Sequence, residues 1–161
     1  MKEPGIRTLT AKKLVGKMMK MSLVDNRTGE LWRSFMQQRS EIVNCLSPDL
    51  FSMQVYDPPF DPETFRPDNP FEKWATCEVN NFSEVPEGMR TFELQGGLYA
   101  VFLYKGDMRG AAEAFRHIFE TWLRASGYIV DHRPHFELLG EKYKNGDPQS
   151  EEEIWIPIRP K

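Results

Sequence analysis

Residues 96–141, GGLYAVFLYKGDMRGAAEAFRHIFETWLRASGYIVDHRPHFELLGE, contain the pattern that decides the fold. Residues 98–104 are apolar or aromatic on both alternating faces, which predicts a central strand of a sheet. A glycine turn follows, and the apolar spacing then becomes that of an amphipathic helix over about 109–126. A second strand comes next and carries Glu137 among apolar neighbours, which makes this carboxylate the most informative residue of the chain.

The rest of the chain follows the same succession of elements. Residues 7–22 alternate loosely and predict one long strand with a bulge at Gly16. A helix is predicted over 28–43 with Thr28 as its N-cap. The remaining predicted strands are separated by a proline-rich loop and by turns; they are 50–56, 71–79, 90–94 and 154–158.

These elements form a repeat in order, although not in residue identity. The order strand, helix, strand, strand occurs once over about 7–80 and again over about 90–158. Two such units side by side predict an α+β fold with a mostly antiparallel sheet and both helices on one face. Folding of 161 residues buries enough surface for a stable core, so we expect one domain over 1–161.

Several short motifs in the second unit resemble a known family. They are Tyr99-Ala100-Val101-Phe102, Lys105-Gly106, Trp122-Leu123, Ser126-Gly127-Tyr128, Phe136-Glu137 and Ile154-Trp155-Ile156-Pro157-Ile158. This set resembles the GyrI-like small-molecule-binding domain, which is also the effector-binding domain of AraC/MerR-type multidrug-sensing transcription regulators. The chain departs from the family pattern at Leu139, where a tyrosine is usual, and at Asp107, where a proline is common. The resemblance implies a pseudo-twofold fold with a ligand cleft between the two helices and the sheet.

The resemblance also places Glu137 in that cleft, at the position of the family's ligand-contacting glutamate. Aromatic residues on the predicted inward faces have two interpretations, as ordinary core packing or as walls of the cleft. They are Trp32, Phe35, Tyr104, Phe115, Phe119 and Trp155. An aromatic cleft with one buried carboxylate suits a flat, lipophilic cation, because ring faces attract positive charge.

The composition excludes several other classes of function. Lys and Arg number 21 and Asp and Glu number 24, so the net charge of −3 argues against direct binding of nucleic acid. No signal peptide or membrane-spanning run is present, and we therefore expect a cytoplasmic protein without membrane contact. Cys45 and Cys77 lack metal-ligand spacing and are expected to be reduced thiols.

The sequence predicts neither a metal site nor a cofactor. His132 and His135 are three residues apart, but no cluster of carboxylates or cysteines completes a coordination sphere around them or His117. The glycines do not match the spacing of nucleotide-binding turns. The acidic run at 151–153 is interpreted as the solvated start of a strand.

Three functions follow from the resemblance. The first is a stand-alone binding protein for small amphipathic or cationic molecules, with a role in sensing, sequestration or resistance and with a possible protein partner. The second is a hydrolase that opens strained cyclopropane-type genotoxins with Glu137 as general base. The third is a gyrase-inhibitor-like protein that acts through protein contacts. The binding function is the leading interpretation, and the sequence contains no motif of a Ser or Cys nucleophile.

Overall fold

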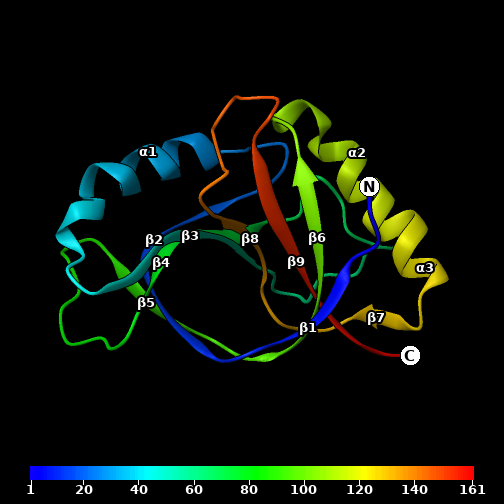
Figure 1. Ribbon diagram of the computed structural model, residues 1–161, viewed down its shortest axis with the longest axis horizontal. Helices are drawn as coiled ribbons and strands as arrows, with labels where there is room; N and C mark the ends of the chain where they lie inside the picture. Colours follow the sequence, from blue (N-terminus) through cyan, green and yellow to red (C-terminus); the bar gives the residue numbers. More distant parts are fainter.

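The computed structural model describes all residues from 1 to 161 and contains one sheet with two helical segments (Figure 1). The first unit comprises β1 (Gly5–Leu9), β2 (Lys12–Met21), α1 (Thr28–Gln38), η1 (Arg39–Glu41), β3 (Cys45–Val55) and β4 (Phe71–Val79). The second begins with β5 (Arg90–Leu94), β6 (Gly97–Lys105), η2 (Met108–Gly110), α2 (Ala111–Arg116), η3 (His117–Trp122) and α3 (Leu123–Ala125). It ends with β7 (Tyr128–Val130), β8 (His135–Leu139) and β9 (Glu151–Pro160).

The strand order has the symmetry of the predicted repeat. It reads β1-β6-β9-β8-β3-β4-β2-β5, and β7 pairs with a further part of β9. All of these pairings are antiparallel. Exchanging the two units, so that β1 replaces β5, β2 replaces β6, β3 replaces β8 and β4 replaces β9, reproduces the same order. The pseudo-twofold axis therefore passes between β3 and β8, and the predicted α+β fold is confirmed.

Both helical segments cover the same face of the sheet, which we call the helix face. Ala75, Ser52, Glu137, Ile154 and Phe102 are opposite one another on successive strands from β4 to β6, so their side chains share one face. At one end of this row, Ala75 belongs to the buried cluster of α1. At the other end, Ile154 and Phe102 belong to the cluster of α2–α3. Figure 1 shows the two segments on either side of the central strands.

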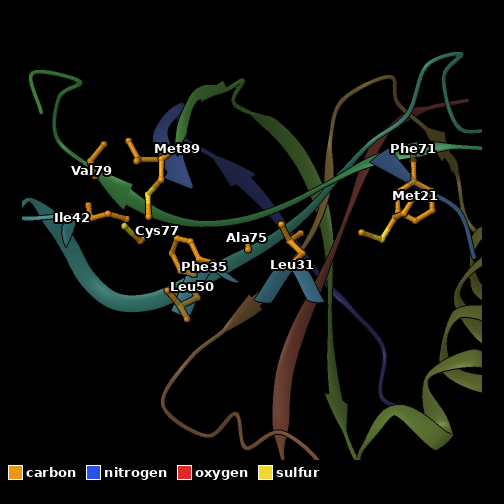
Figure 2. Packing of buried hydrophobic residues seen from close by; sticks show 11 residues of the cluster. Met21, Leu31, Phe35, Ile42, Leu50, Phe71, Ala75, Cys77, Val79 and Met89 are labelled. Carbon is orange, nitrogen blue, oxygen red and sulfur yellow. The ribbon is translucent and has the colours of Figure 1, made fainter. Parts of the chain in front are cut away.

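Three buried clusters hold these layers together. The first lies between α1 and the sheet, and Figure 2 shows Leu31 and Phe35 of α1 pointing toward Ala75 and Leu50 of the sheet. The second lies between α2–α3 and strands β6 and β9. The third occupies the opposite face, where the curled sheet encloses residues such as Tyr99, Phe136 and Trp155. Each helix therefore covers its own half of the sheet.

The predicted strand over 7–22 is two strands with different partners. The chain leaves β1, which pairs with β6, and enters β2, which pairs with β4 and β5 at the other end of the sheet. The break is at residues 10 and 11, and no register shift occurs at Gly16. The link from β5 to β6 crosses this break closely. A Cβ on Gly96 would lie 2.5 Å from the Leu9 carbonyl oxygen.

The helices differ from the prediction in their details. Thr28 is the first residue of α1 and not its N-cap; Arg27 occupies the N-cap position without a side-chain capping bond, and Asn26 Oδ1 accepts a hydrogen bond from the Thr28 backbone N–H at 3.0 Å. The helix over 109–126 is continuous from 108 to 125, but it contains the π-helix η3. No helix in the structure has the length and apolar composition that crossing a bilayer requires.

The two cysteines form a disulfide, so the prediction of reduced thiols is wrong. Cys45 pairs with Val79 on the neighbouring strand, and a register shift in β3 follows between Cys45 and Leu50. This arrangement places Cys45 diagonally across from Cys77, with Cα atoms 6.1 Å apart. The sequence separation of 32 residues gave no sign of this proximity.

Gly16 allows β2 and β4 to approach closely, and this contact is testable. A Cβ at Gly16 would lie 1.9 Å from the Ala75 carbonyl oxygen, which is backbone and cannot rotate away. Gly16→Ala should therefore lower the free energy of unfolding by about 2 kcal/mol or more in urea denaturation. Gly127→Ala is the control, because no atom lies within 4 Å of its added Cβ. Equal effects of the two substitutions would contradict the close packing of β2 on β4.

Candidate functional site

Polar side chains occupy the centre of the helix face, between the areas that the helices cover. They come from the three neighbouring strands β8, β3 and β4, and we call them the polar floor: Ser52, Gln54, Lys73, His135 and Glu137. Four of them are buried, and the Glu137 side chain is 15% exposed. Buried polar groups are retained only where partners satisfy them, so this concentration distinguishes the centre of the sheet from its flanks.

Glu137 is the best-connected member of the polar floor. Gln54 Nε2 donates hydrogen bonds to Glu137 Oε1 at 3.2 Å and Oε2 at 3.0 Å. Lys73 Nζ lies 3.9 Å from Oε1, which is an ion-pair distance. The structure thus supplies a cationic partner that the sequence interpretation of an isolated carboxylate did not include.

His135 lies beside this group and is neutral. Burial lowers the pKa of His135 to about 3, so the ring does not carry charge at physiological pH. Its Nε2 atom is buried and has no hydrogen-bond partner. The rings of Tyr56, Phe60 and Phe119 surround it, with centroid distances of 5.0, 5.0 and 6.4 Å.

Glu152 adds a second carboxylate to the same face, one row beyond Ile154 on β9. Burial, and then the negative charge of Glu137, raise the pKa of Glu152 to about 7, while Lys73 lowers it. The interpretation of residues 151–153 as a solvated strand start is therefore wrong for Glu152. Its alternation with Ile154 and Ile156 places it on the inward face of the strand.

Aromatic side chains and two loops cover the polar floor. Phe60, from the loop between β3 and β4, packs on Tyr56, Phe65 and Phe119 at centroid distances of 5.0, 4.9 and 5.1 Å. On the other side, the loop between β8 and β9 carries Tyr143 and lies between α1 and α2 (Figure 1). Burial, and then the charges of Glu152 and Glu137, raise the pKa of the Tyr143 hydroxyl.

Two small pockets open beside these loops. One, of about 50 Å³, is lined by Tyr104, Asp107, Tyr143 and Glu152 among others. The other, of about 70 Å³, includes Tyr56 and Phe60. Pockets for drug-sized ligands are roughly 300 Å³ or more. Neither pocket has the volume for such a ligand.

The predicted aromatic residues lie in different environments. Phe119 is next to His135 and Phe60, and Phe115 stacks on Phe119 at 6.4 Å. Tyr104 lines the pocket that also contains Glu152, and its hydroxyl donates a hydrogen bond to the Asp107 carbonyl oxygen. These three side chains therefore lie around the polar floor or its entrance.

The other three predicted aromatics pack on α1 or on the opposite face of the sheet. Phe35 is fully buried beneath α1, and Trp32 is half-buried on α1 with its ring edge-on to Phe35. Trp155 is opposite Phe136 in the register, so it lies on the opposite face of the sheet from Glu137, where it stacks on Phe136 at 5.1 Å. For Phe35 and Trp155 the core-packing interpretation describes the observed surroundings.

Sequence reasoning missed Lys73, Gln54, Tyr56 and Phe60. A signal existed for Lys73, because it alternates onto the same strand face as Phe71, Ala75 and Cys77, where a lysine has no solvent. No comparable signal existed for Phe60, since a proline-rich loop does not indicate where its aromatic side chain packs. The structure brings no three His, Cys, Asp or Glu side chains together in a metal-binding arrangement.

Comparison with known proteins agrees with this architecture. The family model for Cass2, described as integron-associated effector binding protein, matches residues 5–158. The chain is similar to the transcriptional regulator BrlR of Pseudomonas aeruginosa, with 30% identity over 131 residues that cover 81% of this chain and 46% of the relative. The chain therefore spans about half the length of this curated relative.

Solved structures show the same fold at low sequence identity. The structure of SAV2435 bound to tetraphenylphosphonium matches with a TM-score of 0.67 and 16% identity, over 98% of this chain and 94% of the other. The C-terminal domain of EcmrR matches with a TM-score of 0.74 and 13% identity, over 99% and 98% of the two chains.

The raised pKa of Glu152 gives a pH dependence of stability with a definite sign. The folded state holds a proton on Glu152 between pH 4.5 and about 7, where an unfolded glutamate has lost it, so stability falls as the pH rises through this window. Glu152→Gln cannot ionise. It should be more stable than the wild type by about 2 kcal/mol at pH 8, and the difference should vanish near pH 4, in urea denaturation at both pH values. Glu141→Gln, on the exposed loop, is the control, and a pH-independent effect of Glu152→Gln would contradict the burial of this carboxylate.

Proposed function

The chain belongs to the family of integron-associated effector binding proteins, and on this basis we propose that it binds small amphipathic molecules with a positive charge. The site is the polar floor between α1 and α2–α3. The observation that carries the proposal is Glu137, a largely buried carboxylate at the centre of the sheet, with the rings of Tyr56 and Phe119 packed around the neighbouring His135.

The electrostatics of the polar floor support a cationic group in the ligand. Two carboxylates, Glu137 and Glu152, face a single ammonium, Lys73. When both carboxylates are ionised, the three side chains together carry a net charge of one negative unit. A positive ligand group would favour the ionised form of Glu152, because an opposite charge lowers the pKa of a buried carboxylate. Binding of a cation is therefore expected to release a proton near neutral pH.

The aromatic side chains support an apolar, flat body in the same ligand. Tyr56, Phe60 and Phe119 form one wall around His135. Each ring face attracts a nearby cation by about 0.5 to 2 kcal/mol, in addition to the apolar area that the ligand buries. Phe60 packs against Phe119 and His135 in this structure. If its loop were displaced, an aromatic ligand would replace the contacts of the Phe60 ring with its own.

The relatives support a role in sensing. One similar structure contains tetraphenylphosphonium, a lipophilic cation, and the similar proteins BrlR and EcmrR include a transcriptional regulator and a DNA-bound protein. We infer that this chain provides the ligand-binding step of such a response. Ligand binding between the two halves would change the position of α1 relative to α2–α3. A partner or further segments would respond to this change.

Glu137→Gln tests the charge of this site. The amide keeps the shape but removes the carboxylate that balances Lys73, so a cation loses its attraction. Affinity for tetraphenylphosphonium, measured by calorimetry, should fall by about 2 kcal/mol or more. Triphenylphosphine oxide, a neutral ligand of related shape, should lose little.

A control for this experiment is available on the same sheet. Glu153→Gln makes the same chemical change on the opposite face, where Glu153 accepts a hydrogen bond from Trp155 Nε1 at 3.0 Å. It should leave both affinities unchanged. Equal losses for the two ligands in Glu137→Gln would mean that Glu137 only supports the pocket, and no loss for either would place the site elsewhere.

A further inference from the structure

Lys73 has a long ion pair and no direct hydrogen bond in the polar floor. Its side chain is 7% exposed, and the neighbouring positions on its strand face, Phe71 and Ala75, are buried core residues. An ammonium carries three N–H donors. The nearest carboxylate oxygen, Oε1 of Glu137, is 3.9 Å from Nζ, which is too long for a hydrogen bond.

The carboxylate of this pair is better satisfied than the ammonium. Both oxygens of Glu137 accept hydrogen bonds from Gln54 Nε2. A ligand with only a positive charge would therefore meet a carboxylate that already has an amide donor and a counter-ion. A ligand with an anionic oxygen group would meet an ammonium whose N–H donors make no hydrogen bond to the protein.

A polar atom without a hydrogen-bond partner lies on the same row of the sheet as Lys73. Gln54 pairs with Lys73 on one side and with His135 on the other, so the two side chains are two strand spacings apart, roughly 10 Å. His135 Nε2 is buried without a hydrogen bond, and the residue is 5% exposed. Leaving such a group unpaired is costly, and a polar ligand atom would satisfy it.

We propose that the preferred ligands are aromatic zwitterions, in which an anionic oxygen group binds Lys73 while the cationic group binds at Glu137 and Glu152. This inference rests on the proposed function and narrows its ligand class. Lys73 then acts as a selectivity residue, because it disfavours a permanent cation that has no anionic group. The ligand's carboxylate would replace the long contact to Glu137 with direct hydrogen bonds from Nζ.

A matched pair of dyes separates the two ligand classes. Rhodamine B carries a carboxylate and is a zwitterion, whereas its ethyl ester has the same aromatic body and is a cation. Fluorescence anisotropy of both dyes gives two dissociation constants for each protein variant. Wild-type protein should bind rhodamine B at least about tenfold more tightly than the ester, as a buried charge pair requires.

Variants at Lys73 assign this preference to the ammonium. Lys73→Met keeps the aliphatic chain but removes the charge. The dissociation constant of the ester divided by that of rhodamine B should fall to about one or below, because Glu137 is then free to bind the ester. Lys73→Arg keeps the charge and should retain the preference for rhodamine B. Lys20→Met, at an exposed position on β2, is the control and should leave the ratio unchanged. The ratio is insensitive to the fraction of folded protein, so a loss of stability in Lys73→Met does not obscure it.

The outcomes separate this inference from the proposed function. Binding of both dyes with equal affinity to wild type, or a ratio that Lys73→Met leaves unchanged, would overturn the zwitterion preference and leave small-molecule binding intact. Absence of binding by both dyes would contradict the proposed function together with the inference.

Discussion

The pairing of β3 with β8 is the constraint on which the rest of the structure depends. It joins the two units at the pseudo-twofold axis, and each helical segment packs mainly on its own half of the sheet. The helix face of these strands is therefore apolar core at Leu50, beneath α1, and polar at Ser52, Gln54 and Glu137, between the two segments. Gln54 of β3 donates hydrogen bonds to Glu137 of β8 there, and Lys73 of the adjacent strand β4 forms a longer ion pair with the same carboxylate. The polar floor thus lies where two compact halves join through their central strands.

Much of the fold could be predicted from local sequence patterns, and the exceptions have a common cause. The alternation over 98–104 and the helical spacing after residue 110 depend on burial within one element, and both features are present in the structure. Partner choice depends on the whole chain. Residues 7–22 therefore appeared to be one strand, although β1 and β2 lie in opposite halves of the sheet. The disulfide was missed for the same reason, since a register shift in β3 brings Cys45 near Cys77.

The residues of the site divide in the same way, into those that a local pattern predicts and those that depend on the pairing of distant strands. Strand alternation is sufficient to place Glu137 on the helix face, and it places Trp155 on the opposite face of the sheet. The counter-ion Lys73 lies on a strand more than 60 residues earlier in the sequence, and only the pairing of β4, β3 and β8 brings the two together. Phe60 was not predictable from any periodicity, because its position depends on the packing of an irregular loop. Hydrolysis by Glu137 stays a prediction.

The exchange of first strands between the units has an evolutionary consequence. β1 pairs with β6 and β5 pairs with β2, so each unit completes the sheet of the other. A chain of half this length would lack a partner for its first strand, and two copies could supply it to each other as a strand-exchanged homodimer. In such a dimer every acidic side chain beside the twofold axis would occur twice, as a repulsive pair. Fusion of the two copies into one gene removes this restriction, because one central strand can then keep Glu137 while the other presents Ser52 opposite it.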